Sequence, residues 1–395
     1  MPSSPIVERI ARANAGREPE RLALKYQAMR RNALGFLRGT NHLFHEDWPE
    51  RSPLDETPRA WITGDLHLEN FGSYKGDNRL VYFDLNDFDD AALAPCSRDL
   101  ARFVTSVFVA AKTLGVRERD ARSLATRFLS AYRSELAEGK ARWVERQIAE
   151  GLVLELLERA IRLTRKGLLQ TRTILGRRGR RLRLGRRALP ISEVDRERVA
   201  GLLARFAGHE EDPGFYRLLD AARRVAGNAS LGLERYVLLV EGRGSPDRNY
   251  ILDLKQAAPT NAVRASSIRA GHWTSEAERI VTIQRWVQAV SPALLHPVRA
   301  GGRSYVLREL QPSEDRLSIQ AWRGGIAPLE GVMAAMGQIV AWSHLRSGGR
   351  KGSATTDEWI GFAERKGWDS ELIAHALPYS RRIERDWREF VEATG

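Results

Sequence analysis

Apolar residues at loosely helical spacing open the chain. From Ile6 to Leu34 their spacing predicts helices across most of residues 1–50, and Pro53 and Pro58 then break the pattern. A short apolar run at residues 80–83 predicts a buried strand, because it follows a Lys-Gly-Asp-Asn turn. Long apolar faces return from residue 98 to about 176, where we expect helices.

After Gly208 the pattern changes to strands. Residues 218–225, 236–242 and 250–257 predict three strands, with a Gly-rich turn between the first two. The elements expected after them are a helix over about 275–290, a hairpin over 294–298 and 303–310, and helices over 331–346, 357–366 and 369–393.

These patterns divide the chain into four parts. They are an N-terminal helical segment (1–58), the first part of a helical lobe (59–207), a β-rich lobe (208–325) and returning C-terminal helices (326–395). We therefore expect an α+β fold in which a small antiparallel-sheet lobe is inserted in a mainly helical lobe.

Composition narrows the class. The 395 residues, 43% of them hydrophobic, are enough for a bilobal enzyme. No apolar run approaches the roughly 20 residues that cross a bilayer, and the start lacks the order of a signal peptide, so we expect a cytoplasmic protein without a membrane partner. A single cysteine, Cys96, excludes an internal disulfide and a thiolate cluster. Any metal is therefore expected on oxygen ligands.

Much of the net charge of +13 sits in one stretch. Residues 159–187 contain no acid, and the basic residues of its densest part are Arg162, Arg165, Lys166, Arg172, Arg177, Arg178, Arg180, Arg181, Arg183, Arg186 and Arg187. Such a patch attracts polyanions, nucleic acid included. The alternation of Arg and Leu before Gly185 favours instead a solvated hairpin, since no aromatic residue interleaves to stack on bases.

Candidate chemistry begins at residues 63–70, Thr-Gly-Asp-Leu-His-Leu-Glu-Asn. This spacing lets one loop aim the Asp65 carboxylate at a substrate hydroxyl and the Asn70 amide at a divalent cation. The predicted strand ends in an acidic run, from which Asp84 or Asp87 would hold the same ion. His67 is either a structural histidine or a catalytic group that contacts substrate or metal.

The β-rich lobe carries a second set of candidates. Gly227, Ser230 and Gly232 lie in the turn between two strands, Lys255 ends the third strand, and Glu278 lies on the following helix. This order suits phosphate binding, because backbone amides cover phosphates, the lysine grips them, and a helix glutamate orients the lysine. Glu276 is the alternative glutamate. The other interpretation is an ordinary hairpin, an exposed lysine and a helix-start carboxylate.

These residues carry a family resemblance. Residues 64–70 resemble the Gly-Asp-Leu-His-x-x-Asn catalytic loop of aminoglycoside and choline phosphotransferases in the protein-kinase-like superfamily, and residues 87–101 resemble their Asp-Phe-Glu-Asp-Ala to Asp-Leu-Ala stretch. Taken whole, the chain resembles the bacterial domain of unknown function numbered 2252. The matching segments are residues 36–39, 64–72, 84–89, Ser230-x-Gly232, Arg235-Tyr236 and Lys255.

The resemblance implies a bilobal kinase-like fold that binds ATP with Mg²⁺ or Mn²⁺. Lys255 would clamp phosphates under the glycine turn, and Glu309-Leu310 would meet adenine. Asn70 to Asp84 is the expected metal-ligand spacing, but counting back from Asp99 reaches Asp87, whose downstream match is longer and favours it. Asp99 is expected to brace the loop. Thr63 departs from the family, which usually has histidine there.

The order of the parts is unlike that of an ordinary kinase. Lys255 lies 190 residues after Asp65, whereas the lysine lobe normally comes first, and the helix at residues 332–344 resembles the one that normally runs into the catalytic loop. The sequence therefore predicts a circular permutation. The predicted activity is phosphoryl transfer from ATP to a hydroxyl, on a small molecule. The alternatives are AMP transfer on the same fold and a non-catalytic pseudokinase that binds ATP or polyanions.

Overall fold

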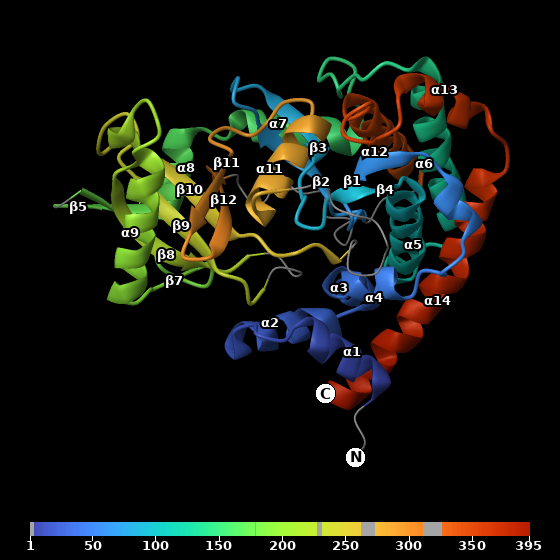
Figure 1. Ribbon diagram of the computed structural model, residues 1–395, viewed down its shortest axis with the longest axis horizontal. Helices are drawn as coiled ribbons and strands as arrows, with labels where there is room; N and C mark the ends of the chain where they lie inside the picture. Colours follow the sequence, from blue (N-terminus) through green and yellow to red (C-terminus); the bar gives the residue numbers. More distant parts are fainter. Residues whose placement is uncertain (1–3, 178, 227–230, 262–272, 311–325) are drawn as a thin grey trace.

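The computed structural model describes residues 4–177, 179–226, 231–261, 273–310 and 326–395. Its architecture is α+β, as predicted. In Figure 1 a twisted antiparallel sheet with α9 lies on the left and a helical lobe on the right, while the first helices run beneath both. Among the described helices, none is long and apolar enough to cross a membrane.

The N-terminal segment is helical, as expected. Its elements are α1 (Pro5–Ala13), α2 (Pro19–Arg30), α3 (Ala33–Gly39), α4 (Asn41–Glu46) and the 3-10 turn η1 (Pro53–Glu56). The two ends of the chain lie side by side, because Ser4 bonds to Glu389 and Arg30 donates to the Thr394 carbonyl at 2.6 Å.

Two small antiparallel pairs follow, β1 (Arg59–Ile62) with β4 (Ala92–Pro95) and β2 (Phe71–Lys75) with β3 (Val81–Leu85). The predicted catalytic loop joins β1 to β2. The acidic run joins β3 to β4, so both loops emerge from one small scaffold.

Helices build the core of this lobe. They are α5 (Ser97–Thr113), α6 (Glu118–Glu138), α7 (Gly151–Arg162), α12 (Ile326–Arg346), α13 (Thr356–Glu364) and α14 (Trp368–Thr394). From Ser97 to Ala111 every residue of α5 is buried, so neighbours surround it on all sides. The expected helical stretch to residue 176 is interrupted at 139–150 and ends in the strand β5 (Thr173–Gly176).

The larger sheet is antiparallel, with the order β11-β12-β10-β9-β8-β7. Its strands are β7 (Ala188–Leu189), β8 (Leu218–Arg224), β9 (Arg235–Val240), β10 (Tyr250–Gln256), β11 (His296–Ala300) and β12 (Arg303–Glu309). The helix α11 (Glu276–Val287) connects β10 to β11. The boundary expected at residue 208 falls too late, because β7 pairs with β8 and α9 (Glu193–Ala207) packs its apolar side on the sheet.

The arginine-rich stretch is no free hairpin. It forms α8 (Arg165–Arg172), β5 and β6 (Gly179–Leu182), and Leu169 and Leu182 are buried in a cluster with Val237, Ile251 and Leu310. The stretch thus covers one face of the sheet, while α9 covers the other. The solvated hairpin that we expected is present in part, since β5 pairs with β6 and most of their residues are at least partly exposed, but Leu169 and Leu182 dock the stretch on the sheet.

The segment after α12 returns to β1. Ala354 N donates to Arg59 O at 2.8 Å, and Trp61 Nε1 donates to Arg350 O at 2.9 Å. The end of α12 therefore lies beside the strand that leads into the predicted catalytic loop.

Close packing of α12 on α6 generates a stability prediction. A Cβ at Gly337 would lie 2.2 Å from the Phe128 carbonyl oxygen. Gly337→Ala should destabilise the protein by about 1–3 kcal/mol in chemical denaturation, since backbone must move apart. The control is Gly361→Ala in α13, where a Cβ meets nothing within 4 Å. The control should be neutral or slightly stabilising; equal effects of the two substitutions would contradict the packing.

Candidate functional site

The loop after β1 turns at Gly64, a position where a side chain does not fit. Gly64 has φ 75°, and a Cβ there would lie 2.1 Å from the Asp90 carbonyl oxygen. The turn therefore presses the start of the predicted catalytic loop against the acidic loop.

A buried carboxylate holds this turn. Asp99, in the first turn of α5, accepts from Thr63 N at 2.7 Å, from Thr63 Oγ1 at 2.8 Å and from Gly64 N at 2.9 Å. Burial raises the pKa of Asp99 to about 6, although these bonds oppose the rise. The expected bracing role of Asp99 is confirmed.

The histidine that Thr63 displaces has a replacement from another element. His45, in α4, donates from Nε2 to the Gly64 carbonyl at 2.8 Å, and Asn41 Nδ2 donates to the same oxygen at 2.9 Å. Burial lowers the pKa of His45 to about 4, so its ring is neutral. A histidine still braces the loop, but it comes from 19 residues upstream.

Asp65 lies beside a buried arginine that the sequence did not single out. Arg102, in α5, is 1% exposed and donates to the Asp65 carboxylate from Nε at 2.6 Å and Nη2 at 2.5 Å. Burial raises the pKa of Asp65 to about 7, Arg102 opposes the rise, and Asp90 and Asp87 add to it. A carboxyl with a pKa near neutrality can take or give a proton at physiological pH.

Asn70 is buried with an unused polar atom. Its Nδ2 has no hydrogen-bond partner among the described residues. The same holds for the side-chain oxygen Oδ1 of the neighbouring Asn86, whose backbone N–H donates to Asn70 O at 2.9 Å. Unpartnered buried amides are rare and point to a missing ligand or water. His67, also buried, accepts from Glu69 N at 3.1 Å, which ties its ring to the loop itself.

The two candidate metal ligands on the acidic run, Asp84 and Asp87, differ clearly in exposure and in their contacts. Asp84 is 2% exposed, and its carboxylate already accepts from Leu85 N, Ala289 N and, at 3.4 Å, Arg346. Asp87 is 40% exposed and 4.0 Å from Lys255 Nζ. Asp84 thus belongs to the packing of the helical lobe, and Asp87 faces the site.

Lys255, on the sheet lobe, contacts the acidic run of the helical lobe. Its ammonium donates to Asp89 and lies near Asp87, so the structure brings the predicted residues Lys255 and Asp87 together from different lobes. Among the described residues, no three His, Cys, Asp or Glu side chains form a ready-made metal site.

The sheet face around Lys255 carries more positive charge than the sequence suggested. Asp253, on the same face of β10, is 1% exposed and accepts from Arg235 at 2.6 and 2.8 Å and from Arg224 at 2.8 Å, with Arg308 at 3.7 Å. Burial and the neighbouring Arg235 lower the pKa of Arg224 to about 9. Three guanidiniums share one carboxylate, so this face has capacity for a further anion. The alternation of side chains along β10 was the signal in the sequence, because it places Asp253 and Lys255 on the same face of the strand.

The predicted partner of Lys255 is not the observed one. Glu278 accepts from Thr274 N at 2.6 Å at the start of α11, where Ser275 caps the helix, so among described contacts it acts as a first-turn carboxylate. Arg279 takes the buried position instead. It is 1% exposed and donates to the carbonyls of Asp89 and Ala91, which fixes the acidic run to α11.

The glycine turn is only partly placed. Gly227 and Ser230 lie outside the described residues. Gly232 has φ 94°, and a Cβ there would lie 2.7 Å from the Cβ of Arg17, whose Nη1 donates to Leu231 O at 2.7 Å. The N-terminal segment therefore contacts the described end of this turn.

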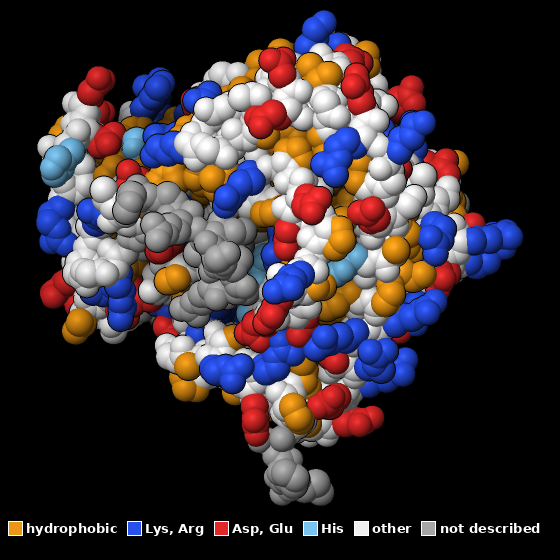
Figure 2. Space-filling view, turned by 45° about the vertical axis from the view of Figure 1, so that its right-hand side comes forward, with side chains coloured by type: hydrophobic (Ala, Val, Ile, Leu, Met, Phe, Trp, Pro, Cys, Tyr) orange, Lys and Arg blue, Asp and Glu red, His pale blue; other side chains and the backbone are white. Residues whose placement is uncertain are grey.

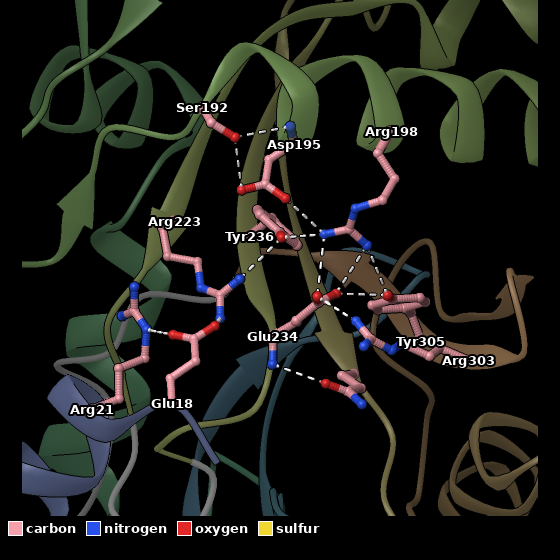
Figure 3. A network of polar contacts seen from close by, with 11 residues as sticks. Glu18, Arg21, Ser192, Asp195, Arg198, Arg223, Glu234, Tyr236, Arg303 and Tyr305 are labelled. Carbon is pink, nitrogen blue, oxygen red and sulfur yellow. Dashed lines mark hydrogen bonds and ion pairs between the residues drawn. The ribbon is translucent and has the colours of Figure 1, made fainter. Parts of the chain in front are cut away.

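A polar network fastens that segment to the sheet (Figure 3). Glu18 accepts from Arg223, which donates to Tyr236 Oη at 3.0 Å, and Arg198 of α9 donates to the same hydroxyl at 2.6 Å. Arg198 also donates to Glu234, which accepts a second hydrogen bond from Tyr305 at 2.7 Å. Helix α2, three strands and α9 are thus linked on the side of the sheet that α9 covers.

Lys25 of α2 is another residue of the N-terminal segment that lies near the site. It is 3% exposed and donates to Asn14 Oδ1 at 2.8 Å, and burial keeps its pKa well below the usual range. Its charge interacts with those of Asp65 and Asp90. Figure 2 shows Lys and Arg interspersed with Asp and Glu over one face of the molecule.

Glu309 and Leu310 border cavities of different character. Both line a cavity of about 910 Å³ between the lobes, where Glu309 pairs with Arg79 at 2.6 Å. Leu310 also lines a cavity of about 420 Å³ with Val237 and Arg224, on the sheet face that carries Lys255. Of the predicted adenine contacts, only Leu310 lies toward the Lys255 side.

Fold and site together define an α+β protein in which an acidic loop and a basic sheet face meet across two lobes. The chain belongs to the bacterial family DUF2252, described as an uncharacterized protein conserved in bacteria, whose sequence model matches residues 17–393. Comparison with curated proteins and with solved structures gave no match.

The raised pKa of Asp65 predicts a pH-dependent effect of its neutralisation. Between pH 4 and pH 7 the folded carboxyl holds a proton that the unfolded one has lost, so its contribution to stability falls as pH rises. Relative to wild type, Asp65→Asn should therefore gain stability from pH 5 to pH 7, by up to about 1.4 kcal/mol per pH unit, in urea titrations. Exposed Asp357→Asn is the matched control and should run parallel to wild type. Parallel curves for both variants would contradict the raised pKa.

Proposed function

We propose that this protein is an ATP-dependent phosphotransferase with a circularly permuted, kinase-like arrangement, which moves a phosphoryl group to a hydroxyl with Mg²⁺ or Mn²⁺. One observation carries the proposal. Lys255 and Asp89, 166 residues apart and in different lobes, form an ion pair beside Asp87, whose charge also acts on Asp65.

The order of elements around Lys255 supports a kinase-like sheet lobe. Strands β8, β9 and β10 are neighbours in sequence and in the sheet, Lys255 lies on the third, and α11 follows it before β11 and β12. Kinases use this arrangement to place a lysine under a glycine-rich turn and beside a helix. The chain departs from the kinase arrangement at α11. There Arg279 contacts the acidic run, whereas a kinase has a glutamate that contacts the lysine.

The return of the chain to β1 supports the permutation. Residues just after α12 hydrogen-bond to β1, so a short link could join α12 to the catalytic loop in an unpermuted protein.

The residues divide the chemistry as follows. The acceptor oxygen attacks the γ-phosphorus, the bond from that phosphorus to the bridging oxygen of ADP breaks, and Asp65 takes the hydroxyl proton. Arg102 positions Asp65 and keeps its pKa from rising further. Lys255 and Arg235 would exchange part of their carboxylate contacts for phosphate oxygens.

Asn70 and Asp87 would hold the divalent cation, which neutralises charge on the phosphates. The adenine would lie along Val237 and Leu310, beside the 420 Å³ cavity. Most of the rate enhancement would come from positioning and charge neutralisation.

The two aspartates of the acidic run give a test of this assignment. Asp87→Ala should weaken Mg²⁺-dependent ATP binding at least tenfold in calorimetry while leaving stability near that of wild type, because its side chain is 40% exposed. Asp84→Ala should instead destabilise the fold by about 3 kcal/mol, since it strands buried donors and Arg346.

Failure of wild type to bind ATP with Mg²⁺ would refute the proposal at its first step. If ATP binds, mass spectrometry of the products separates the outcomes. A gain of phosphate on the acceptor supports phosphoryl transfer, and a gain of AMP contradicts it.

A further inference from the structure

A second large cavity lies between the lobes, away from the catalytic loop. Its volume is about 910 Å³, and its walls come from β2 and the turn after it, from α7 and α8, and from the beginning of β10 and the end of β12. None of Asp65, Asn70, Asp87 or Lys255 lines it. The residues proposed to carry out phosphoryl transfer therefore lie outside this cavity, which meets the 420 Å³ cavity of the proposed adenine position at Thr171, Arg172 and Leu310.

The walls of this cavity are strongly basic. Six cationic side chains line it against two acidic ones, Asp77 and Glu309. The cations are Lys75, Arg79, Arg162, Arg165, Arg172 and Arg243. Glu309 is already paired with Arg79. Within the described part of the chain, Arg162, Arg165 and Arg243 make no ion pair with a carboxylate. The charge of these three arginines is therefore not compensated by a described carboxylate, and the cavity concentrates positive charge.

An aromatic ring holds two of the guanidiniums in place. Tyr250 is buried, with Arg165 4.6 Å and Arg79 5.8 Å from its ring centroid. Such stacking restricts the two side chains before any ligand arrives, which lowers the entropy cost of binding. The first turn of α8, with Thr164 as its cap, also lines the cavity and adds the partial positive charge of a helix start.

We propose that this cavity binds a small molecule bearing two or more phosphate groups, at a site distinct from the nucleotide site. Arginine forks bind phosphate oxygens in pairs, and several forks around one concave space fit a compact polyphosphorylated ligand. The concave shape and the buried tyrosines do not suit stacking of nucleic acid bases.

Bound there, the ligand would tie the two lobes together. Arg79 and Lys75 belong to the β2–β3 pair of the helical lobe, Arg243 and Tyr250 belong to the sheet lobe, and Arg165 belongs to the covering stretch. An anion that contacts all three would favour one relative placement of the lobes. The arginine-rich stretch therefore acts as part of a ligand site.

The test uses inorganic tripolyphosphate as the probe and calorimetry on the full chain. Wild type should bind it, with affinity that falls as salt rises, and Arg162→Gln with Arg165→Gln should weaken binding at least tenfold. Both arginines are exposed, so the variant should fold. The matched control is Arg117→Gln with Arg119→Gln, two exposed arginines at the start of α6 outside this cavity, which should bind as wild type does.

Lys255→Ala separates this site from the nucleotide site. Tripolyphosphate binding that survives Lys255→Ala and disappears in the cavity variant supports the inference, whatever happens to ATP. Loss in Lys255→Ala alone, or equal binding by the cavity variant and its control, overturns it. Equal affinity for citrate overturns the assignment of a phosphate ligand. Tighter binding of a single-stranded oligonucleotide that tripolyphosphate cannot displace indicates a nucleic-acid surface, and that result also overturns the inference.

Discussion

The buried carboxylate of Asp90 is the contact on which the assembly of the site depends. It accepts from Asn41 Nδ2 at 2.8 Å and from Asn261 N at 2.7 Å, and its backbone carbonyl accepts from Thr260 at 2.7 Å and lies against Gly64. Four segments therefore meet at one residue: the N-terminal segment, the predicted catalytic loop, the acidic run and the loop after the Lys255 strand. Removing this carboxylate would leave buried donors from separate parts of the chain without an acceptor.

Charge is arranged around this contact at a cost to stability. Burial alone would disfavour Asp65, Asp99, Arg224 and Lys25 in their charged forms, and the described pairs compensate only in part. Apolar residues of similar volume would pack these buried positions more stably. Clusters of perturbed groups are typical of functional sites, and here acids face bases across a boundary between lobes, which suits binding of a metal phosphate.

Local patterns in the sequence predicted most elements, and contacts between distant segments account for what it missed. Strand alternation and turn residues identified β8 to β10, and the loop motif identified Asp99 as a brace. Spacing left Asp84 and Asp87 open, because only burial distinguishes two carboxylates on one short run. Glu278 was misassigned since its neighbour Arg279 takes the buried position, and the role of Arg102 depends on how α5 packs, which no local pattern records.

The central claim is that Lys255 contacts the phosphates of a nucleotide bound between the lobes. An acyl-phosphate derivative of ATP tests this directly, because a lysine amine beside the phosphates attacks the acyl carbonyl, keeps the acyl group as an amide and releases ATP. Mass spectrometry of the digested protein then identifies the acylated lysine. The account predicts acylation of Lys255 that excess ATP with Mg²⁺ suppresses. Acylation of Lys75 in the basic cavity, or ATP-insensitive acylation of exposed lysines only, would contradict it.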